Sequence, residues 1–220
     1  MDSFRSEPHS AVLFGMGTEE HVGEEIKLAG GSRVLIHYGR PGVTDPDLLA
    51  RVRHSCEDAG VDYEELGGVL KNARIAKIEE GIRMCRDDQI DFVLAIGGGS
   101  VVGSAKAIAA GACWDGSFRE CIERGREVSG ALPVGVIVTV PGSGSELSNS
   151  TVVTDDPPQG GREIRIFQMK SDFLYAKFAI CNPDLVTCFP KHLALSFANI
   201  FARVCGNFFN GACQGLNEEL

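Results

Sequence analysis

The sequence lacks the features that mark several classes of protein. It has no run of Lys and Arg in its 220 residues, and its formal net charge is −9. Nucleic acids and anionic membrane surfaces attract clustered basic side chains, so both are disfavoured as partners. No apolar run reaches the roughly 20 residues that a membrane-spanning helix needs, and the polar N-terminus has no signal-peptide core. We therefore expect a cytoplasmic protein.

The chain also has no CxxC pair, although it contains eight cysteines. Without that spacing, neither a zinc site nor a redox motif of the usual kind is indicated. Most of the cysteines fall on apolar faces, as Cys56 and Cys85 do on two predicted helices. We expect reduced thiols that are buried as small apolar side chains.

What the sequence does have is an alternation of buried strands and amphipathic helices. FVLAI, which begins at Phe92, is a continuous apolar run of the kind found in parallel strands that are buried on both faces. The alternation predicts an α/β fold built on a doubly wound parallel sheet. DDPPQGG, residues 155–161, indicates a hairpin tip, and from Thr187 the chain becomes helical. The segments expected are strands at 11–15, 32–39, 61–66, 92–96 and 132–141, and helices at 19–28, 45–59 and about 75–85.

A glycine turn follows the FVLAI strand and leads into an alanine-rich helix. Its residues are Gly97, Gly98, Gly99 and Ser100. Glycines let the backbone approach a diphosphate closely, and a helix N-terminus attracts phosphate. The sequence is neither GxGxxG nor GxxxxGK[ST], the two commonest nucleotide fingerprints. On spacing alone, a phosphate cradle and a plain tight turn between strand and helix both remain possible.

A second turn of small residues, in TVPGSGSELSN, follows another buried strand. It offers backbone amides and the hydroxyls of Thr139, Ser143 and Ser145. In a doubly wound sheet, ligands bind beyond the carboxyl ends of the strands. Two such turns therefore favour one shared phosphorylated ligand.

Three segments resemble the iron-containing, metal-dependent alcohol dehydrogenase family, in particular its butanol-dehydrogenase-like branch. They are AIGGGSVVGSAKAIAAGA, VIVTVPGSGSELSNSTVVTDD and YAKFAICNPDLVTCFP, and ELGGVLKNARIAKIEEGIRMC and VLFGMGT fit the same pattern. The resemblance runs in order from about Ala11 to Phe209. It implies a Rossmann-like dinucleotide-binding domain, residues 1–186, followed by the start of an all-helical domain, residues 187–220.

The resemblance also implies an activity and its cofactors. The family transfers hydride between NAD or NADP and an alcohol, aldehyde or ketone, with the help of a divalent metal, Fe or Zn. The glycine turn should then face the cofactor diphosphate, and the second turn should extend toward the nicotinamide. Leu185 and Thr187 should close the far side of the groove. A small alcohol or aldehyde is the expected substrate, and a homo-oligomer, a dimer, is the expected assembly.

The end of the second strand bears on the choice of cofactor. An acidic residue there would bind a ribose 2′-hydroxyl and repel a 2′-phosphate. The chain instead has Gly39 and Arg40, with no carboxylate before Asp45. A guanidinium suits a phosphate, so we expect NADP, with NAD as the alternative. Arg40 could equally be a solvated turn residue whichever cofactor binds.

The metal-binding half of the family pattern is not matched. The family carries an Asp and, four residues later, a His on one face of a helix, where this chain has Asn199 and Arg203. Asn is a weak neutral ligand, and Arg is a permanent cation. The two further histidine ligands of the family lie beyond Leu220. No metal ligand is therefore nominated, and the five histidines of the chain are expected to be structural or on the surface.

Smaller departures occur around the cofactor site. The family pattern GGGSxxD has an acid where this chain has Gly103. A lysine that is common in the family, in the loop before its PxxxxxDP segment, has no counterpart, and Arg165 is the nearest cation. The DP of that segment has become Asn182-Pro183.

Two hypotheses of function follow, and neither nominates a catalytic residue. In the first, the chain is the incomplete N-terminal portion, or a diverged member, of an NAD(P)-dependent oxidoreductase. In the second, it binds NADP without catalysis, as a pseudoenzyme or a partner subunit that lacks the metal site. A Tyr–Lys pair of the short-chain dehydrogenase type is not visible in the sequence.

Overall fold

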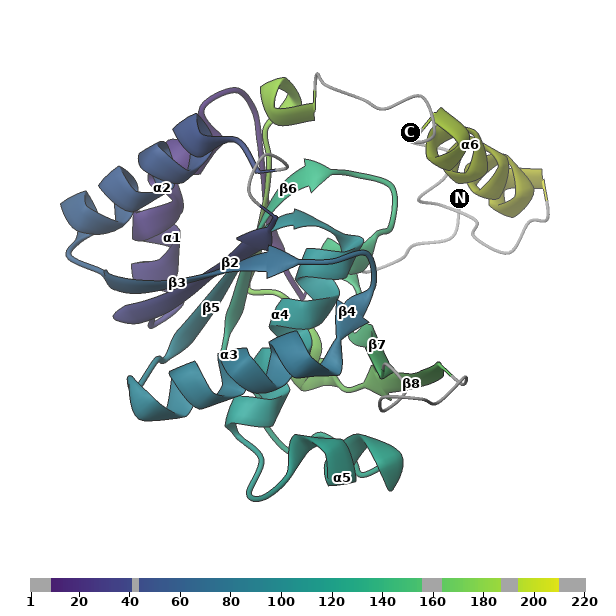
Figure 1. Ribbon diagram of the computed structural model, residues 1–220. Coiled ribbons are helices and arrows are strands. Elements are labelled where there is room, and N and C mark those ends of the chain that lie inside the picture. The colour runs from purple at the N-terminus through teal and green to yellow at the C-terminus, as the bar shows by residue number, and fades with distance from the viewer. Residues whose placement is uncertain (1–8, 41–43, 156–163, 187–193, 210–220) are drawn as a thin grey trace.

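The computed structural model describes residues 9–40, 44–155, 164–186 and 194–209. A six-stranded sheet forms its centre, in the order β1-β9-β6-β5-β2-β3. Every neighbouring pair is parallel, which confirms the predicted α/β class (Figure 1). The strands are β1 Ala11–Phe14, β2 Arg33–Gly39, β3 Asp62–Val69, β5 Phe92–Gly98, β6 Val134–Val140 and β9 Phe178–Cys181.

Helices cover both faces of this sheet, so it is doubly wound. One apolar core joins the sheet to α1 (Val22–Leu28) and α2 (Pro46–Ala59). The other joins it to α3 (Ile75–Asp87), α4 (Gly99–Ala112) and α5 (Phe118–Glu123). β5 contributes to both cores, which is why its sequence is apolar without alternation.

Local sequence signals explain the ends of α2. The side chain of Asp45 accepts a 3.0 Å hydrogen bond from the backbone N–H of Asp47, and Pro46 opens the helix. Gly60 ends the helix in the left-handed conformation, at φ 65°. The helix expected at 19–28 is less regular, because a 3₁₀ turn, η1 (Thr18–His21), precedes α1.

A second, smaller sheet lies beside α4. It has the order β4-β7-β8, with β4 Ala73–Arg74, β7 Ser150–Asp155 and β8 Arg165–Lys170. β7 and β8 are antiparallel, as the hairpin prediction requires, and its predicted tip lies largely outside the described residues. The buried carboxylate of Asp155 ties β7 to β8 through Arg165 (2.7 Å) and to α5 through Arg119 (2.6 Å). Burial alone would raise the pKa of Asp155, but these two hydrogen bonds outweigh it and lower that pKa.

The remaining described elements are three short 3₁₀ turns in the loops after β6, β8 and β9, and one helix near the end of the chain. The short 3₁₀ turns are η2 Ser145–Leu147, η3 Asp172–Leu174 and η4 Pro183–Val186. The last helix, α6 (Ala194–Phe209), stands away from the sheet in Figure 1. Several of its apolar side chains are exposed, namely Phe201, Val204, Phe208 and Phe209.

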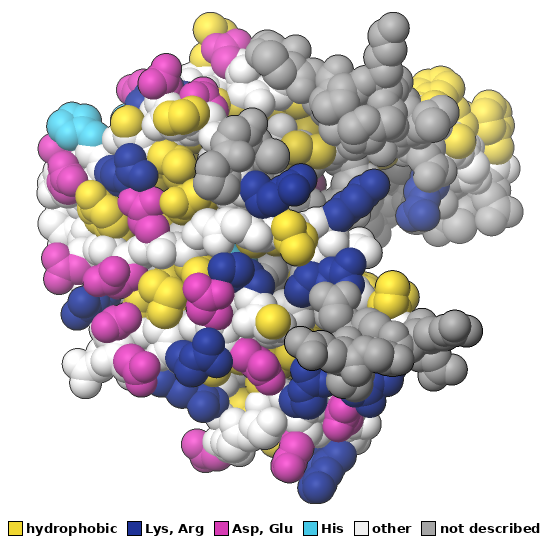
Figure 2. All heavy atoms as spheres, in the orientation of Figure 1, with side chains coloured by type: hydrophobic (Ala, Val, Ile, Leu, Met, Phe, Trp, Pro, Cys, Tyr) yellow, Lys and Arg dark blue, Asp and Glu magenta, His cyan; other side chains and the backbone are white. Residues whose placement is uncertain are grey.

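The described cysteines are free, as the sequence predicts, but not all of them are buried. Acidic and basic side chains both occur across the face drawn in Figure 2. The six cysteines within the described residues are free, and Cys56, Cys85 and Cys121 are buried. Cys113 was expected to be buried but is exposed, because it follows the last turn of α4. In the described part of the chain, no helix has the length and apolarity that crossing a bilayer requires.

Candidate nucleotide-binding site

The two turns of small residues lie at the carboxyl edge of the central sheet. β5 and β6 run parallel and end together, with Gly98 beside Val140 and an irregularity in register between Gly97 and Gly98. From there β5 leads into α4 and β6 into the serine-rich loop 141–149. Strand ends of this kind are where ligands bind in doubly wound sheets.

Contact between the two turns depends on the absence of a side chain at Gly99. A Cβ at this position would lie 2.7 Å from Oγ of Ser143 and 3.2 Å from Oγ of Ser145. Gly98 is constrained in a similar way, since a Cβ there would lie 2.8 Å from Cβ of Val140. The glycines therefore bring the N-terminus of α4 against the loop after β6.

A groove of about 550 Å³ opens beside this contact. Its walls come from the start of α4, the loop after β6, the strands β7 and β8, and the loop before β4 with the start of β4. Most of its polar groups are hydroxyls. The lining residues are Asn72, Ala73, Gly99, Ser100, Gly103, Ser143, Ser145, Ser148, Ser150, Thr151, Val152, Thr154 and Ile166. None of these is Lys or Arg, so an anion in the groove would be held by hydroxyls and backbone amides.

Ser100 is positioned by the loop before β4. Its Oγ accepts a 3.1 Å hydrogen bond from the backbone N–H of Asn72, a residue at φ 67°. A hydroxyl that accepts in this way keeps its proton for an oxygen in the groove. Ser143 is placed similarly, since its Oγ accepts from the N–H of Ser145 at 3.2 Å.

Gly103, the position where the family pattern has an acid, packs against β7. The hydroxyl of Thr151 donates a 2.7 Å hydrogen bond to the carbonyl of Gly103. A Cβ at Gly103 would lie 2.9 Å from Oγ1 of Thr151. The glycine is therefore matched to its neighbour, and an acidic side chain would have to displace Thr151.

Lys106, which the sequence reasoning passed over, is fully buried behind the groove. Its Nζ donates to the carbonyl of Ser145 at 2.7 Å and to the carbonyl of Ser148. Burial lowers its pKa to about 8, against an opposing effect of Glu146. The signal that could have found it is a single lysine in an otherwise small and apolar helix, SAKAIAAGA.

His37 joins three elements beneath the glycine turn. Its Nδ1 lies 2.8 Å from the carbonyl of Leu66, and its Nε2 lies 2.9 Å from Oγ of Ser104. A carbonyl can only accept, so Nδ1 carries the proton and Nε2 accepts from the serine. Burial lowers the pKa of His37 to about 4, so the ring is neutral at pH 7. This is the structural role expected of it.

The other nominated residues that the structure describes lie outside the groove lining. Gly39 is buried at the end of β2 opposite Val69, and Arg40 is exposed beside it. Thr139 is half-buried on β6, and Leu185 packs against the core on the α1–α2 face of the sheet. Thr187 lies outside the described residues. Gly97 packs against the side chain of Val101 in the first turn of α4, where a Cβ would lie 2.5 Å from Cγ2 of Val101. Of the nominated residues, those that line the groove are Gly99, Ser100, Ser143 and Ser145.

The described residues were compared with the metal-binding pattern of the family. Within the described ranges, no group of three or more His, Cys, Asp and Glu side chains could hold a metal ion. Arg203 is exposed on α6, four residues after Asn199. The ring of His9 stacks on Tyr175 with centroids 4.2 Å apart. His21 and His54 are exposed, and His192 lies outside the described residues.

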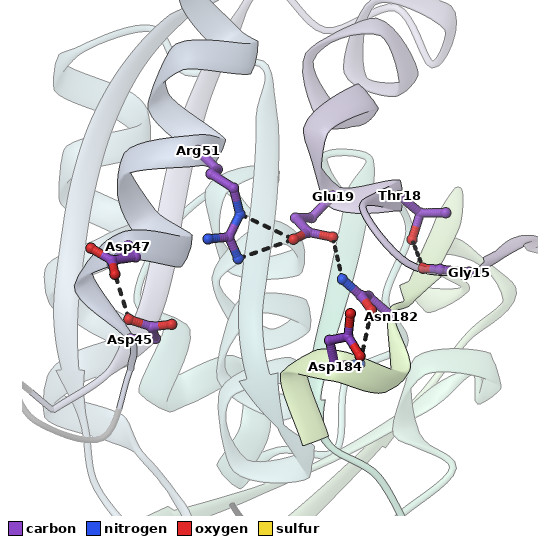
Figure 3. Close-up of polar contacts among 8 residues, drawn as sticks. All are labelled: Gly15, Thr18, Glu19, Asp45, Asp47, Arg51, Asn182 and Asp184. Atoms are coloured by element: carbon purple, nitrogen blue, oxygen red, sulfur yellow. Dashed lines mark hydrogen bonds and ion pairs between the residues drawn. The ribbon is translucent and has the colours of Figure 1, made fainter. Parts of the chain in front are cut away.

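A buried carboxylate links three segments at the same edge of the sheet (Figure 3). Glu19, in η1, is 2% exposed. Its Oε1 accepts from Nη2 of Arg51 at 3.0 Å, and its Oε2 accepts from Nδ2 of Asn182 at 2.7 Å. Asn182 thus serves as a neutral donor at the position where the family pattern has an acid.

The sequence of the chain is similar to those of one family of enzymes. The family model described as iron-containing alcohol dehydrogenase matches residues 9–183. A Bacillus subtilis protein named probable NADH-dependent butanol dehydrogenase 1 is 31% identical over 211 residues, covering 96% of this chain and 53% of that protein. The Escherichia coli NADPH-dependent aldehyde reductase YqhD is 31% identical over 209 residues, covering 91% of this chain and 51% of that protein.

Solved structures agree with the sequence relatives. The crystal structure of NADH-dependent butanol dehydrogenase A from Thermotoga maritima superposes with a TM-score of 0.78 at 31% identity. That match covers 87% of this chain and 47% of the other chain. The chain spans about half the length of the curated relatives it matches.

Proposed function

Because the chain belongs to the iron-containing alcohol dehydrogenase family, we propose that it forms the nucleotide-binding half of an NAD(P)-dependent oxidoreductase that interconverts an alcohol with an aldehyde or ketone. The observation that carries the proposal is the approach of Gly99 to Ser143 and Ser145. It creates a hydroxyl-lined groove at the carboxyl edge of a doubly wound sheet, where dinucleotides bind.

The residues of the groove fit a dinucleotide diphosphate. α4 has 14 residues, and its first backbone N–H groups, at Gly99 and Ser100, have no partner within the helix. Ser143 and Ser145 add hydroxyl donors across the groove. The nicotinamide ring of the bound cofactor would supply hydride chemistry. The part of this chain is to bind the diphosphate and orient the ring.

The described residues do not fit the divalent metal that the family name implies, since no suitable group of ligands occurs among them. We therefore assign no step to a metal. We keep the division of the chain at residues 186 and 187. Leu185 and Thr187 are proposed to close the far side of the cofactor site, away from the groove beside Gly99, since Leu185 packs on the α1–α2 face of the sheet. A homodimer in the cytoplasm stays a prediction, checked by light scattering of the purified chain and by fractionation of cells.

NADP is the cofactor we propose, with NAD as the alternative. Arg40 is exposed directly after β2, where a 2′-phosphate would lie. The first carboxylate after it, Asp45, is engaged as the N-cap of α2. The relatives include proteins named as NADH-dependent and as NADPH-dependent enzymes. The Arg40 guanidinium is therefore the feature that favours the phosphorylated cofactor.

Fluorescence titration of the purified chain with NADPH and NADH tests both proposals. We expect NADPH to bind about tenfold more tightly, a difference of about 1.4 kcal/mol. Arg40→Ala should remove this preference and leave NADH binding unchanged. Equal or tighter binding of NADH would overturn the preference for NADP. Failure to bind either nucleotide would overturn the proposed function.

Turnover is measured separately, with NADPH, butyraldehyde and Fe²⁺ or Zn²⁺. Oxidation of NADPH that a chelator abolishes would extend the function from binding to catalysis by this chain. Nucleotide binding without turnover would limit the role of this chain to binding.

A further inference from the structure

Lys106 is a fully buried cation that no part of the proposed function uses. It lies on α4, two turns from the helix N-terminus that faces the groove. Its Nζ reaches out of α4 to two carbonyls of the loop after β6, those of Ser145 and Ser148. These residues are 39 and 42 positions away in sequence. A fully buried lysine is rare unless its ammonium is paired, so the groups bonded to Lys106 indicate its role.

Both partners of Lys106 belong to the groove. Ser145 and Ser148 line it, while their carbonyls are bonded to the lysine behind it. A carbonyl that is bonded to an ammonium does not present its negative end to an anion. The loop is thereby held with the hydroxyls of Ser143 and Ser145 available for a phosphate and the carbonyls of Ser145 and Ser148 withdrawn. The hydroxyl of Ser148 donates within the chain, to the carbonyls of Ser145 and Ser150.

Other residues in the first two helical turns of α4 hold this helix to elements other than the loop after β6. Ser104 is bonded to His37 of β2, and the carbonyl of Gly103 is bonded to Thr151 of β7. Lys106 is the side chain of α4 bonded to the loop 141–149. Because this loop carries Ser143 and Ser145, its position relative to Gly99 depends on that bond.

Charge gives Lys106 a second role. Among the described residues that line the groove none is basic, yet a diphosphate carries negative charge. The ammonium of Lys106 lies against the backbone of two lining residues, Ser145 and Ser148, and low-dielectric surroundings strengthen its field there. The charged group that acts on it is Glu146 of η2, which opposes part of this field.

We propose that Lys106 is a positioning residue for the nucleotide: it anchors the loop of Ser145 and Ser148 and places one buried positive charge behind the phosphate groove. The proposal rests on the proposed function, since it assumes a phosphorylated ligand. It does not make Lys106 a catalytic residue, because the side chain touches the loop and not the groove.

Two substitutions separate anchoring from charge in the full chain. Lys106→Met removes both the hydrogen-bond donors and the charge, whereas Lys106→Gln keeps an N–H donor and removes the charge. Lys27→Met, at an exposed position on α1, loses the same charge and is the matched control. Each variant is titrated with NADPH and NADH, and hydrogen exchange of the loop 141–150 is followed without nucleotide.

We expect Lys106→Met to bind NADPH at least about tenfold more weakly and to exchange the loop amides at least about tenfold faster. Lys106→Gln should lose comparable affinity with a smaller increase in exchange, a pattern that a purely structural role would not give. Lys27→Met should match the wild-type chain within about twofold. If Lys106→Met does not fold, Lys106→Gln supplies the comparison.

Nucleotide affinity within about twofold of wild type in both Lys106 variants would overturn the proposal. If the wild-type chain itself binds neither nucleotide, the proposed function fails. The anchoring role is then decided by exchange alone, and unchanged loop exchange in Lys106→Met would overturn it.

Discussion

The side-chain amide of Asn182 donates a 2.7 Å hydrogen bond to the buried carboxylate of Glu19, across 163 positions of sequence. The other oxygen of that carboxylate is held by Arg51. One carboxylate therefore connects the turn after β1, the helix α2 and the turn after β9. The neutral amide at position 182 makes this arrangement possible, because an Asp there would set a second negative charge against Glu19.

Replacing Asn182 by Asp is therefore expected to destabilise the fold by about 3 kcal/mol, the cost of an uncompensated buried charge. Asn182→Ala removes the hydrogen bond to Glu19 and the one that Asn182 accepts from the backbone N–H of Asp184. It adds no charge, so it should cost less, about 1–2 kcal/mol. Urea unfolding at pH 7 measures both. The defect of Asn182→Asp should shrink at acid pH, because one of two adjacent carboxyls then takes up a proton.

The double variant Glu19→Gln with Asn182→Asp provides the control. It restores one donor and one acceptor with their places exchanged, so it should recover at least half of the stability lost in Asn182→Asp. An Asn182→Asp chain as stable as wild type would show that the carboxylate of Glu19 is not confined as described.

The strands and helices whose signals are local could be predicted from the sequence. FVLAI marked β5 because a strand buried on both faces has no alternation. Asp45 and Gly60 sit at the two ends of α2, where their side-chain chemistry and backbone freedom place them. The effect of Gly17 could not be predicted in the same way. This residue, at φ 73°, precedes a 3₁₀ turn, whereas the sequence predicts a regular helix there.

Features that depend on distant partners were missed. β4 is two residues long and forms only by pairing with β7, some 80 positions later. Burial of Lys106 depends on two carbonyls of a loop that follows a different strand. That Gly99 and Ser143 lie near each other could be predicted, because parallel strands end at one edge of the sheet. The closeness of their contact, which leaves no room for a Cβ at Gly99, could not.

That closeness makes Gly99→Ala a sharp test of the site. The added methyl group would lie 2.7 Å from Oγ of Ser143, so the two turns must separate. We expect a loss of about 1–3 kcal/mol in unfolding free energy and NADPH binding at least about tenfold weaker. Calorimetry and fluorescence titration measure the two effects.

Gly206→Ala on α6 is the matched control, because a Cβ there meets nothing within 4 Å. An exposed helical glycine replaced by alanine should be neutral or stabilising by up to about 1 kcal/mol. If Gly99→Ala bound NADPH as well as the wild type, the groove between the turns would not be the diphosphate site.

His37 predicts how stability depends on acid. Its pKa is lowered from 6.5 to about 4 by burial, so the unfolded chain binds the proton more readily than the folded chain. The stability that this neutral histidine allows is fully present above pH 6.5 and is lost as the pH falls from there toward 4. The shift corresponds to about 3 kcal/mol.

His37→Gln should flatten the dependence of unfolding free energy on pH between 6.5 and 4, at the cost of lower stability at pH 7. His54→Gln, at an exposed histidine on α2, is the matched control for loss of a histidine side chain from the surface. An unchanged pH profile in His37→Gln would contradict the assignment of the acid sensitivity to this ring.

Arg165 is the cation nearest in sequence to a lysine that is common in the family, yet the structure engages it elsewhere. Its Nη2 lies 2.7 Å from Oδ2 of Asp155 and 2.9 Å from Oε1 of Glu123. Arg165→Ala should therefore change NADPH affinity by less than about twofold. It should lower stability only slightly, since the Arg165 side chain is 48% exposed and its ion pairs are screened by solvent.

The two arginines on Asp155 also predict a non-additive pair. Arg119 remains as a partner in Arg165→Ala, whereas the double variant Arg119→Ala with Arg165→Ala leaves a buried carboxylate without either ion pair. The double variant should lose more stability than the sum of the two single variants, by about 1–3 kcal/mol. Strict additivity in urea unfolding would show that Asp155 finds other compensation. A nucleotide affinity that falls tenfold in Arg165→Ala alone would instead give this arginine the role of the missing lysine.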